Sequence, residues 1–291
     1  MTTPAQEPGI AGRKWFYDFE ELASVFGDDP CRQVGNRLLQ RYSVITKTWN
    51  AETNSEWTCR LYLAAKLIMS ATLHVNSVYY AEERNLRVVV PYLRYYSVFS
   101  LLRAVCYTLP EHHWNHGALI EISHEKAISG ALDHLRRFDP AIADTVEGEV
   151  RELKAERELI SYRAPSVGDD QVSEKYTLIS LCTLLAEIAQ FNSELFDASL
   201  SRHGKPEAFQ LIPEHLAKLA SVEIDGHYFG DIEDAYRLDY LARKHPRPSN
   251  LMHMMKEGHV DDFFGAWVSR RENTDGLFDP DAMKQIIFDI P

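Results

Sequence analysis

The stretch LYLAAKLIMSATLHVNSVY, residues 61–79, decides the fold class of this chain. Apolar and small side chains recur in it at alternating steps of four and three residues, which places them on one face of an α-helix. The residues on this face are Leu61, Ala65, Ile68, Thr72, Val75 and Tyr79. The spacing predicts a long helix that follows a polar break at residues 50–55 and ends in the polar segment 82–87.

The segments on both sides of this helix show the same periodicity. Helices are expected over residues 18–26, 31–45, 91–109, 126–135, 145–164 and 172–200, with Pro91 in a first turn and Pro110 as a stop. Shorter helices are expected over residues 213–221, 231–244, 249–256, 259–269 and 280–288. Asp225-Gly226 lies between short apolar runs and predicts a small hairpin or a loop.

These elements predict an all-α protein in three parts. We expect a helical unit over residues 55–204. A tail and short helices precede it over residues 1–54, and a C-terminal helical region follows over residues 205–291. The turn-forming segment His203-Gly204-Lys205-Pro206 marks the second boundary.

Composition limits the classes of function. Apolar residues make up 45% of the chain and charged residues 25%, as in ordinary globular proteins. The formal net charge of −12 disfavours general binding to nucleic acid or anionic membranes. Residues 1–12 lack the basic start and apolar stretch of a secretory signal, and no run of about 18 apolar residues occurs. We therefore expect a cytoplasmic protein with no membrane span.

The cysteines and histidines give little support for a metal site. Cys31, Cys59, Cys106 and Cys182 are too widely spaced for a zinc motif or a redox dithiol, and we expect Cys106 and Cys182 to fill core positions.

A second group is the histidine cluster formed by His112, His113, His116 and His124. His112 and His116 are spaced i, i+4, which on a helix would put both rings on one face. Because Pro110 and Gly117 flank this pair, a solvated or turn-stabilising group is the favoured interpretation, with acid–base chemistry or a metal site as alternatives. No cofactor is expected.

Arg157 breaks the apolar stripe of its predicted helix, which runs through Val146, Val150, Leu153 and Ile160. A guanidinium keeps its charge, so burial without a partner is costly. The side chain must pair with a carboxylate, reach the surface, or line a polar cleft.

The helix end around Arg157 gathers hydrogen-bond donors suited to an anion. The candidate anion- or RNA-binding residues are Arg157, Ser161, Tyr162 and Arg163. Two flanking glutamates lower the positive potential of this group. A structural ion pair and an anion-binding cleft are therefore the competing interpretations.

Residues 55–200 resemble the HEPN superfamily of helical proteins. The likeness rests on a helix that ends VYYAE (residues 78–82), a second helix with PYLRYYSVFSLLRA (91–104), a connector with His116-Gly117, and a helix that ends LKAERELISYR (153–163). The Tyr-Tyr segment and the His-Gly connector are most similar to the YaaC-like branch.

The resemblance implies an up-and-down helical bundle over residues 55–204, often dimeric, and in many members a metal-independent ribonuclease. The usual pattern is an Arg, a polar residue directly after it, and a His after four to six residues, with two such motifs facing each other across a dimer cleft. In that chemistry the His handles the 2′-hydroxyl proton and the Arg stabilises charge on the phosphate. Arg157 and Glu158 fit the pattern, but Tyr162 stands where the His is expected, and a phenol is a poor base at neutral pH.

Two functions follow from these observations. The first is a non-catalytic interaction module of the kind found in defence or toxin–antitoxin systems, with a protein partner or a second copy of the chain. The second is RNA binding or RNA cleavage by Arg157, Tyr162 and Arg163 in a dimer cleft. The acidic charge and the missing His favour the first.

Three further patterns have a structural and a functional interpretation. The pairs Tyr79-Tyr80 and Tyr95-Tyr96 suit a helical core, or a pocket that stacks a base. The methionine-rich stretch 251–255 suits helix packing, or a versatile binding surface. Asp231, Asp234 and Asp239 are expected on the solvated face of one helix.

Overall fold

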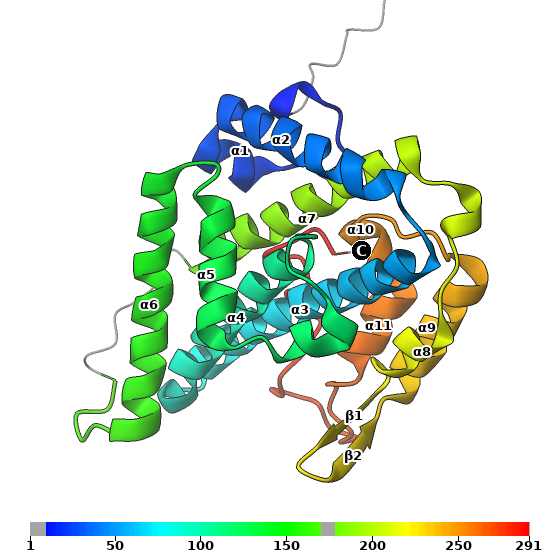
Figure 1. The fold of residues 1–291 in the computed structure, drawn as a ribbon. Helices are drawn as coiled ribbons and strands as arrows, with labels where there is room; N and C mark the ends of the chain where they lie inside the picture. The colour runs from blue at the N-terminus through cyan, green and yellow to red at the C-terminus, as the bar shows by residue number, and fades with distance from the viewer. Residues whose placement is uncertain (1–9, 170–177, 291) are drawn as a thin grey trace, which may run out of the picture.

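The computed structural model describes residues 10–169 and 178–290, and this part of the chain is α-helical apart from one two-stranded sheet. The expected all-α fold class is confirmed. The α-helices are α1 (Glu20–Phe26), α2 (Asp28–Lys47), α3 (Ala51–Glu83), α4 (Val90–Tyr107), α5 (His124–Leu135), α6 (Pro140–Arg163), α7 (Leu178–His203), α8 (Pro213–Ala217), α9 (Ile232–Lys244), α10 (Leu251–Met254) and α11 (Glu257–Gly265). Helix α3 crosses the centre of the molecule, with α5 and α6 toward one edge and α8, α9 and α11 toward the other (Figure 1).

Helix α3 begins earlier than the sequence predicts. The Asn50 side chain accepts the backbone N–H of Thr53 at 3.0 Å, and the Thr53 hydroxyl accepts the N–H of Asn50 at 3.1 Å. This reciprocal capping box satisfies two N–H groups that a helix start leaves open. The expected polar break at residues 50–55 is therefore the first turn of the helix. The predicted face is buried up to Val75, whereas Tyr79 is 37% exposed.

Side-chain caps also set the starts of α5 and α6. The Ser123 hydroxyl accepts the backbone N–H of Lys126, and the Asp139 carboxylate accepts those of Ala141 and Ile142. Asp139 thus opens α6 directly after α5, so the predicted start at residue 145 was about one turn late.

Arg60 joins the two central helices. It lies in α3, is 5% exposed, and donates to the carbonyl oxygens of Tyr107 at 2.8 Å, Cys106 at 3.4 Å and Leu109. These carbonyls lie at the end of α4, where intrahelical partners run out. Burial lowers the pKa of Arg60 to about 10, so the guanidinium stays charged at neutral pH.

Most of the core is continuous through the described residues. The larger of two clusters of buried apolar side chains extends from Ala11 to Ile290 and includes members of each of the segments 1–54, 55–204 and 205–291, while the smaller consists of Val78, Ala81 and Val90. Helix α7 is buried over almost its whole girth, as Cys182, Phe191 and Leu195 illustrate. The three-part division remains a prediction about domain organisation, and the segments share this core.

Two buried carboxylates of α7 hold the N-terminal segment. Glu187 accepts the backbone N–H of Leu22 at 2.6 Å, in the first turn of α1. Glu194 accepts those of Phe16 at 3.0 Å and Tyr17 at 3.1 Å. Burial raises the pKa of Glu187 to about 7. Glu187 takes the place that a side-chain cap of α1 would otherwise fill, and Glu194 holds the segment that precedes α1.

The C-terminal region departs most from the prediction. Strands β1 (Ser221–Ile224) and β2 (His227–Gly230) form an antiparallel hairpin around Asp225-Gly226, so the hairpin interpretation is confirmed and α8 ends well before residue 221.

The predicted helix over residues 280–288 is wrong, because this segment forms turns. Asn76 of α3 donates to the carbonyl oxygens of Asp279 at 2.7 Å and Pro280 at 3.1 Å, and Phe288 is buried in the core. Tertiary contacts thus take the place of helical hydrogen bonds here.

No helix in residues 10–169 and 178–290 has both the length and the apolar composition that crossing a membrane requires.

Candidate functional site

The structure places Arg157 on the aromatic pair of α4. Its guanidinium carbon lies 5.1 Å from the centre of the Tyr95 ring and 5.9 Å from that of Tyr96. The side chain is half-buried, and it forms no ion pair with a carboxylate of the described residues. Its Nε is buried without a hydrogen-bond partner. Among the described residues, cation–π contact with Tyr95 and Tyr96 accommodates this charge.

Of the neighbouring candidate residues, Tyr162 interacts with the Arg157 side chain, whereas Ser161 does not. Burial acts to lower the pKa of Arg157, but a hydrogen bond with Tyr162 and the nearby Tyr96 and Tyr95 raise it above its ordinary value. Tyr162 is 74% exposed and Arg163 is exposed. The Ser161 hydroxyl instead donates to the Arg157 carbonyl at 2.7 Å, which is a bond within its own helix. Tyr162 therefore remains a candidate beside Arg157, whereas the Ser161 hydroxyl donates its hydrogen bond within α6 and not to an anion.

His124 joins the Arg157 group, which the sequence did not indicate. Its Nδ1 lies 2.6 Å from the Tyr95 hydroxyl, and its ring stacks on Phe99 with centroids 4.1 Å apart. Burial and then the charge of Arg157 lower the pKa of His124. No spacing rule links residues 124 and 157, because the folding of α5 and α6 against α4 brings them together.

His112 and His116 do not lie on one α-helix, as the proposed metal-ligand pairing requires. Residues 111–114 form a turn and bend ahead of a 3-10 helix (Asn115–Glu121), so the i, i+4 spacing does not place two rings on one helix face. His112 packs beside Gly130 of α5, and burial lowers its pKa. The His116 side chain lies outside the described part of the structure. Within that part, no group of three or more His, Cys, Asp or Glu side chains is arranged to hold a metal ion.

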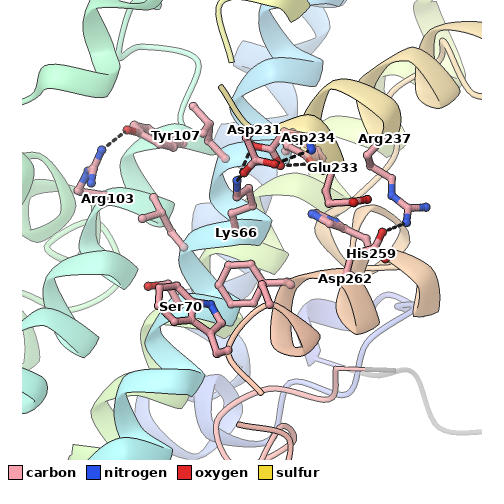
Figure 2. Close-up of a pocket in the computed structure, with 16 residues that line it drawn as sticks. Lys66, Ser70, Arg103, Tyr107, Asp231, Glu233, Asp234, Arg237, His259 and Asp262 are labelled. Atoms are coloured by element: carbon pink, nitrogen blue, oxygen red, sulfur yellow. Dashed lines mark hydrogen bonds and ion pairs between the residues drawn. The ribbon is translucent and has the colours of Figure 1, made fainter. Parts of the chain in front are cut away.

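A pocket of about 460 Å³ lies between α3, α4, α9 and α11 (Figure 2). This volume falls in the range of small-molecule sites. Its wall combines aromatic rings with a group of charged side chains. The charged residues are Lys66, Arg103, Asp231, Glu233, Asp234, Arg237 and Asp262.

Asp234 is the centre of this charged group. Its carboxylate accepts the Tyr62 hydroxyl at 2.6 Å and the Lys66 ammonium at 2.5 Å, and Asp231 lies 3.7 Å from the same ammonium. Asp231 also caps α9 by accepting the Asp234 backbone N–H. Asp234 is only 8% exposed, so the expectation that it belongs to a solvated acidic face was wrong. Asp231 and Asp239 are exposed, and Asp239 pairs with Arg243.

His259 forms a second wall of the pocket. Its ring stacks on Tyr62 with centroids 4.8 Å apart and planes 8° apart. Its Nδ1 lies 3.2 Å from the Met254 carbonyl oxygen, so the neutral ring donates from Nδ1 and leaves Nε2 as an acceptor. Burial lowers the pKa of His259 to about 4, which keeps the ring neutral. One feature of the sequence could have pointed to this site: Lys66 lies inside the apolar run LYLAAKLIM.

The hairpin β1–β2 carries exposed apolar side chains. Val222 pairs with Phe229, and Ile224 pairs with His227, so these four residues share one face of the hairpin. Val222, Ile224 and Phe229 are 49%, 54% and 55% exposed, and none belongs to the core cluster. We call Val222, Ile224 and Phe229 the hairpin face. Two more exposed apolar residues follow on α9, Ile232 and Tyr236.

Comparison with protein-family models, with curated proteins and with solved structures finds no match to this chain.

Proposed function

We propose that this chain is a non-catalytic interaction module that binds a protein partner through the hairpin face. The observation that carries the proposal is the exposure of three apolar side chains on one face of a hairpin that projects beyond the helices (Figure 1). Large exposed apolar patches on soluble proteins often mark interaction sites. The resemblance to HEPN proteins without the catalytic His is compatible with this role, and a cytoplasmic location is part of the proposal.

The hairpin also has open edges. Each of its strands has a single hydrogen-bonded neighbour in the two-stranded sheet. A strand edge presents backbone N–H and C=O groups on which an extended peptide can add a further strand, while the side-chain face supplies specificity. The hairpin therefore offers both main-chain bonding and an apolar contact surface.

Charge favours a different protein over a second copy of this chain. Residues 221–233 contain Glu223, Asp225, Asp231 and Glu233 but no lysine or arginine. Two copies that met at the hairpin would bring like charges together, and the net charge of −12 would add to the repulsion. We therefore assign the surface to a partner segment in which apolar residues alternate with, or are flanked by, lysine and arginine.

A peptide-display selection tests this assignment. The purified chain serves as bait, with counter-selection on the Phe229→Asp variant. The proposal expects enriched peptides to alternate apolar residues and to carry a net positive charge. Enrichment of acidic peptides, or equal binding to the Phe229→Asp variant, would overturn it. Val44→Asp in α2 is the matched control, since Val44 is 68% exposed and lies far from the hairpin in the chain.

A second candidate function is RNA binding at Arg157. The specific observation is a half-buried guanidinium that has aromatic partners and no carboxylate among the described residues, next to His124. Aromatic rings and a cation together suit an unpaired nucleotide. Fluorescence polarisation with a mixed-sequence single-stranded RNA tests it. Arg157→Ala should weaken binding by at least about tenfold, as expected for a charged hydrogen bond.

The control for this experiment is Arg202→Ala, which removes an exposed arginine from α7. An equal loss of RNA affinity in both variants would show that binding depends on overall positive charge and not on Arg157. Absence of RNA binding by the unaltered chain would contradict the RNA hypothesis. Any cleavage of the RNA must disappear with Arg157→Ala to count as an activity of this chain.

A further inference from the structure

The ion pairs within the pocket between α3, α4, α9 and α11 do not neutralise all of the carboxylates that line it. Lys66 is neutralised by Asp234 at 2.5 Å, and Arg237 is paired with Asp262. Asp231, at 3.7 Å from Lys66, is left with a weak contact. Glu233 is exposed and has no hydrogen bond or ion pair with the described residues. The pocket wall therefore has two carboxylates that are not fully compensated.

The remaining cation of the wall is already engaged elsewhere. Arg103 donates to the Tyr107 hydroxyl at 2.8 Å and to the Ile120 carbonyl oxygen at 2.9 Å. Figure 2 shows its guanidinium at the far side of the pocket from the α9 carboxylates. With His259 neutral, four carboxylates and three cations give the lining a net charge of −1. An anionic ligand would meet this excess negative charge.

The other lining groups are suited to a positive charge. Tyr62, Tyr107, Phe263 and Trp267 line the pocket, and Trp267 is 60% exposed. Aromatic faces attract organic cations, and the contact is stronger where water is partly excluded. His259 is 5% exposed, and its Nε2 has no hydrogen-bond partner among the described residues, so it can accept an N–H.

We infer that this pocket binds a small organic cation, an alkyl or arylalkyl ammonium whose apolar body lies against Phe263 and Trp267 and whose N–H groups meet Glu233 and His259. The residues that would contact the ammonium belong neither to the hairpin face nor to the Arg157 group, although Val222 and Phe229 line an adjoining hollow with Lys66, Asp231 and Asp234. The pocket thus gives the chain a binding site for protonated amines.

Isothermal titration calorimetry on the full chain tests the inference with three probes of similar size. The probes are 2-phenylethylammonium, the neutral 2-phenylethanol and the anionic 3-phenylpropanoate. The ammonium should bind and the other two should bind more weakly. No binding of the ammonium at millimolar concentration, or equal binding of either analogue, would overturn the inference.

Variants locate the site. Trp267→Ala removes an exposed ring and should weaken ammonium binding roughly 2- to 30-fold, the range of a cation–π contact. Glu233→Gln should weaken it roughly two- to fivefold, as for an exposed ion pair. Glu214→Gln makes the same charge change on an exposed residue of α8 outside the pocket and should leave binding unaltered.

Two results of the variant series would reject the site. One is unaltered affinity in both pocket variants, and the other is an equal loss in Glu214→Gln. Ile224→Asp changes the hairpin face at a residue that lines neither this pocket nor the adjoining hollow, so it should leave ammonium binding intact. Failure of the hairpin proposal and failure of this inference can therefore be told apart.

Discussion

The helical body and the hairpin differ in the residues that depart from the usual pattern of buried apolar and exposed polar side chains. In the body, two charged groups that enter the interior have several partners: Arg60 reaches three carbonyl oxygens, and Asp234 reaches Tyr62 and Lys66. In the hairpin, apolar side chains enter no interior at all. Substitutions in the body should therefore change stability, while substitutions in the hairpin should change only binding.

The largest effect is expected at Arg60. Arg60→Met keeps much of the apolar stem but removes the charged donor from three carbonyl oxygens at the end of α4. The Tyr107 carbonyl then has no partner among the described residues, while those of Cys106 and Leu109 keep the backbone N–H groups of Leu109 and His112. The free energy of unfolding should fall by about 3 kcal/mol or more. Urea denaturation followed by circular dichroism measures it. Arg202→Met is the control and should change stability by less than about 0.5 kcal/mol. Similar small losses in both variants would show that Arg60 does not tie α3 to α4.

The next effect is expected at Asp234. Asp234→Ala leaves the Lys66 ammonium and the Tyr62 hydroxyl without their acceptor, in a site that is mostly but not fully buried. The loss should be about 2–3 kcal/mol, below the range for completely buried pairs. Asp239→Ala is matched on the same helix and breaks a surface pair with Arg243, so it should cost less than about 1 kcal/mol. Equal costs would contradict the placement of Asp234 in the interior.

Acidification should act on the body through its buried histidines. Burial lowers the pKa of His134 to about 3 and that of His259 to about 4. Between these values and about 6.5 the unfolded chain binds more protons than the folded chain, so stability falls as pH decreases through this window. The maximum slope is about 1.4 kcal/mol per pH unit for each group.

Glu187 should oppose this trend. Its raised pKa of about 7 means that the folded chain binds more protons than the unfolded chain between about 4.5 and 7, so its contribution to stability falls as pH rises there. Glu187→Gln should therefore steepen the gain in stability from pH 5 to pH 7. Denaturation curves at pH 5, 6 and 7 measure both slopes. An unaltered slope in the variant would show that Glu187 titrates alike in both states.

Periodicity predicts the helices of this chain better than it predicts their contacts. The stripe from Leu61 to Val75 depends only on local spacing, so α3 followed from the sequence. Residues 280–288 did not, because Asn76 and the core replace helical bonds with contacts about 200 residues away in the chain.

The candidate sites show the same limit. Arg157 was visible because it interrupts an apolar pattern on its own helix. Asp234 was not, because its partner Lys66 is 168 residues distant and its own helix pattern allows a solvated position. The hairpin turn Asp225-Gly226 was recognisable, but no local rule shows whether its side chains will be covered.

Photo-crosslinking from the hairpin face in living cells tests most directly whether this face binds a protein partner. A photoreactive amino acid replaces Ile224 in one chain and Val44 of α2 in another, since both residues are exposed. We expect one discrete heteromeric product from position 224 that disappears with Phe229→Asp, and no such product from position 44. Phe229→Asp should change the free energy of unfolding by less than about 0.5 kcal/mol. A homodimer, the same product from both positions, or no product at all would contradict the proposal.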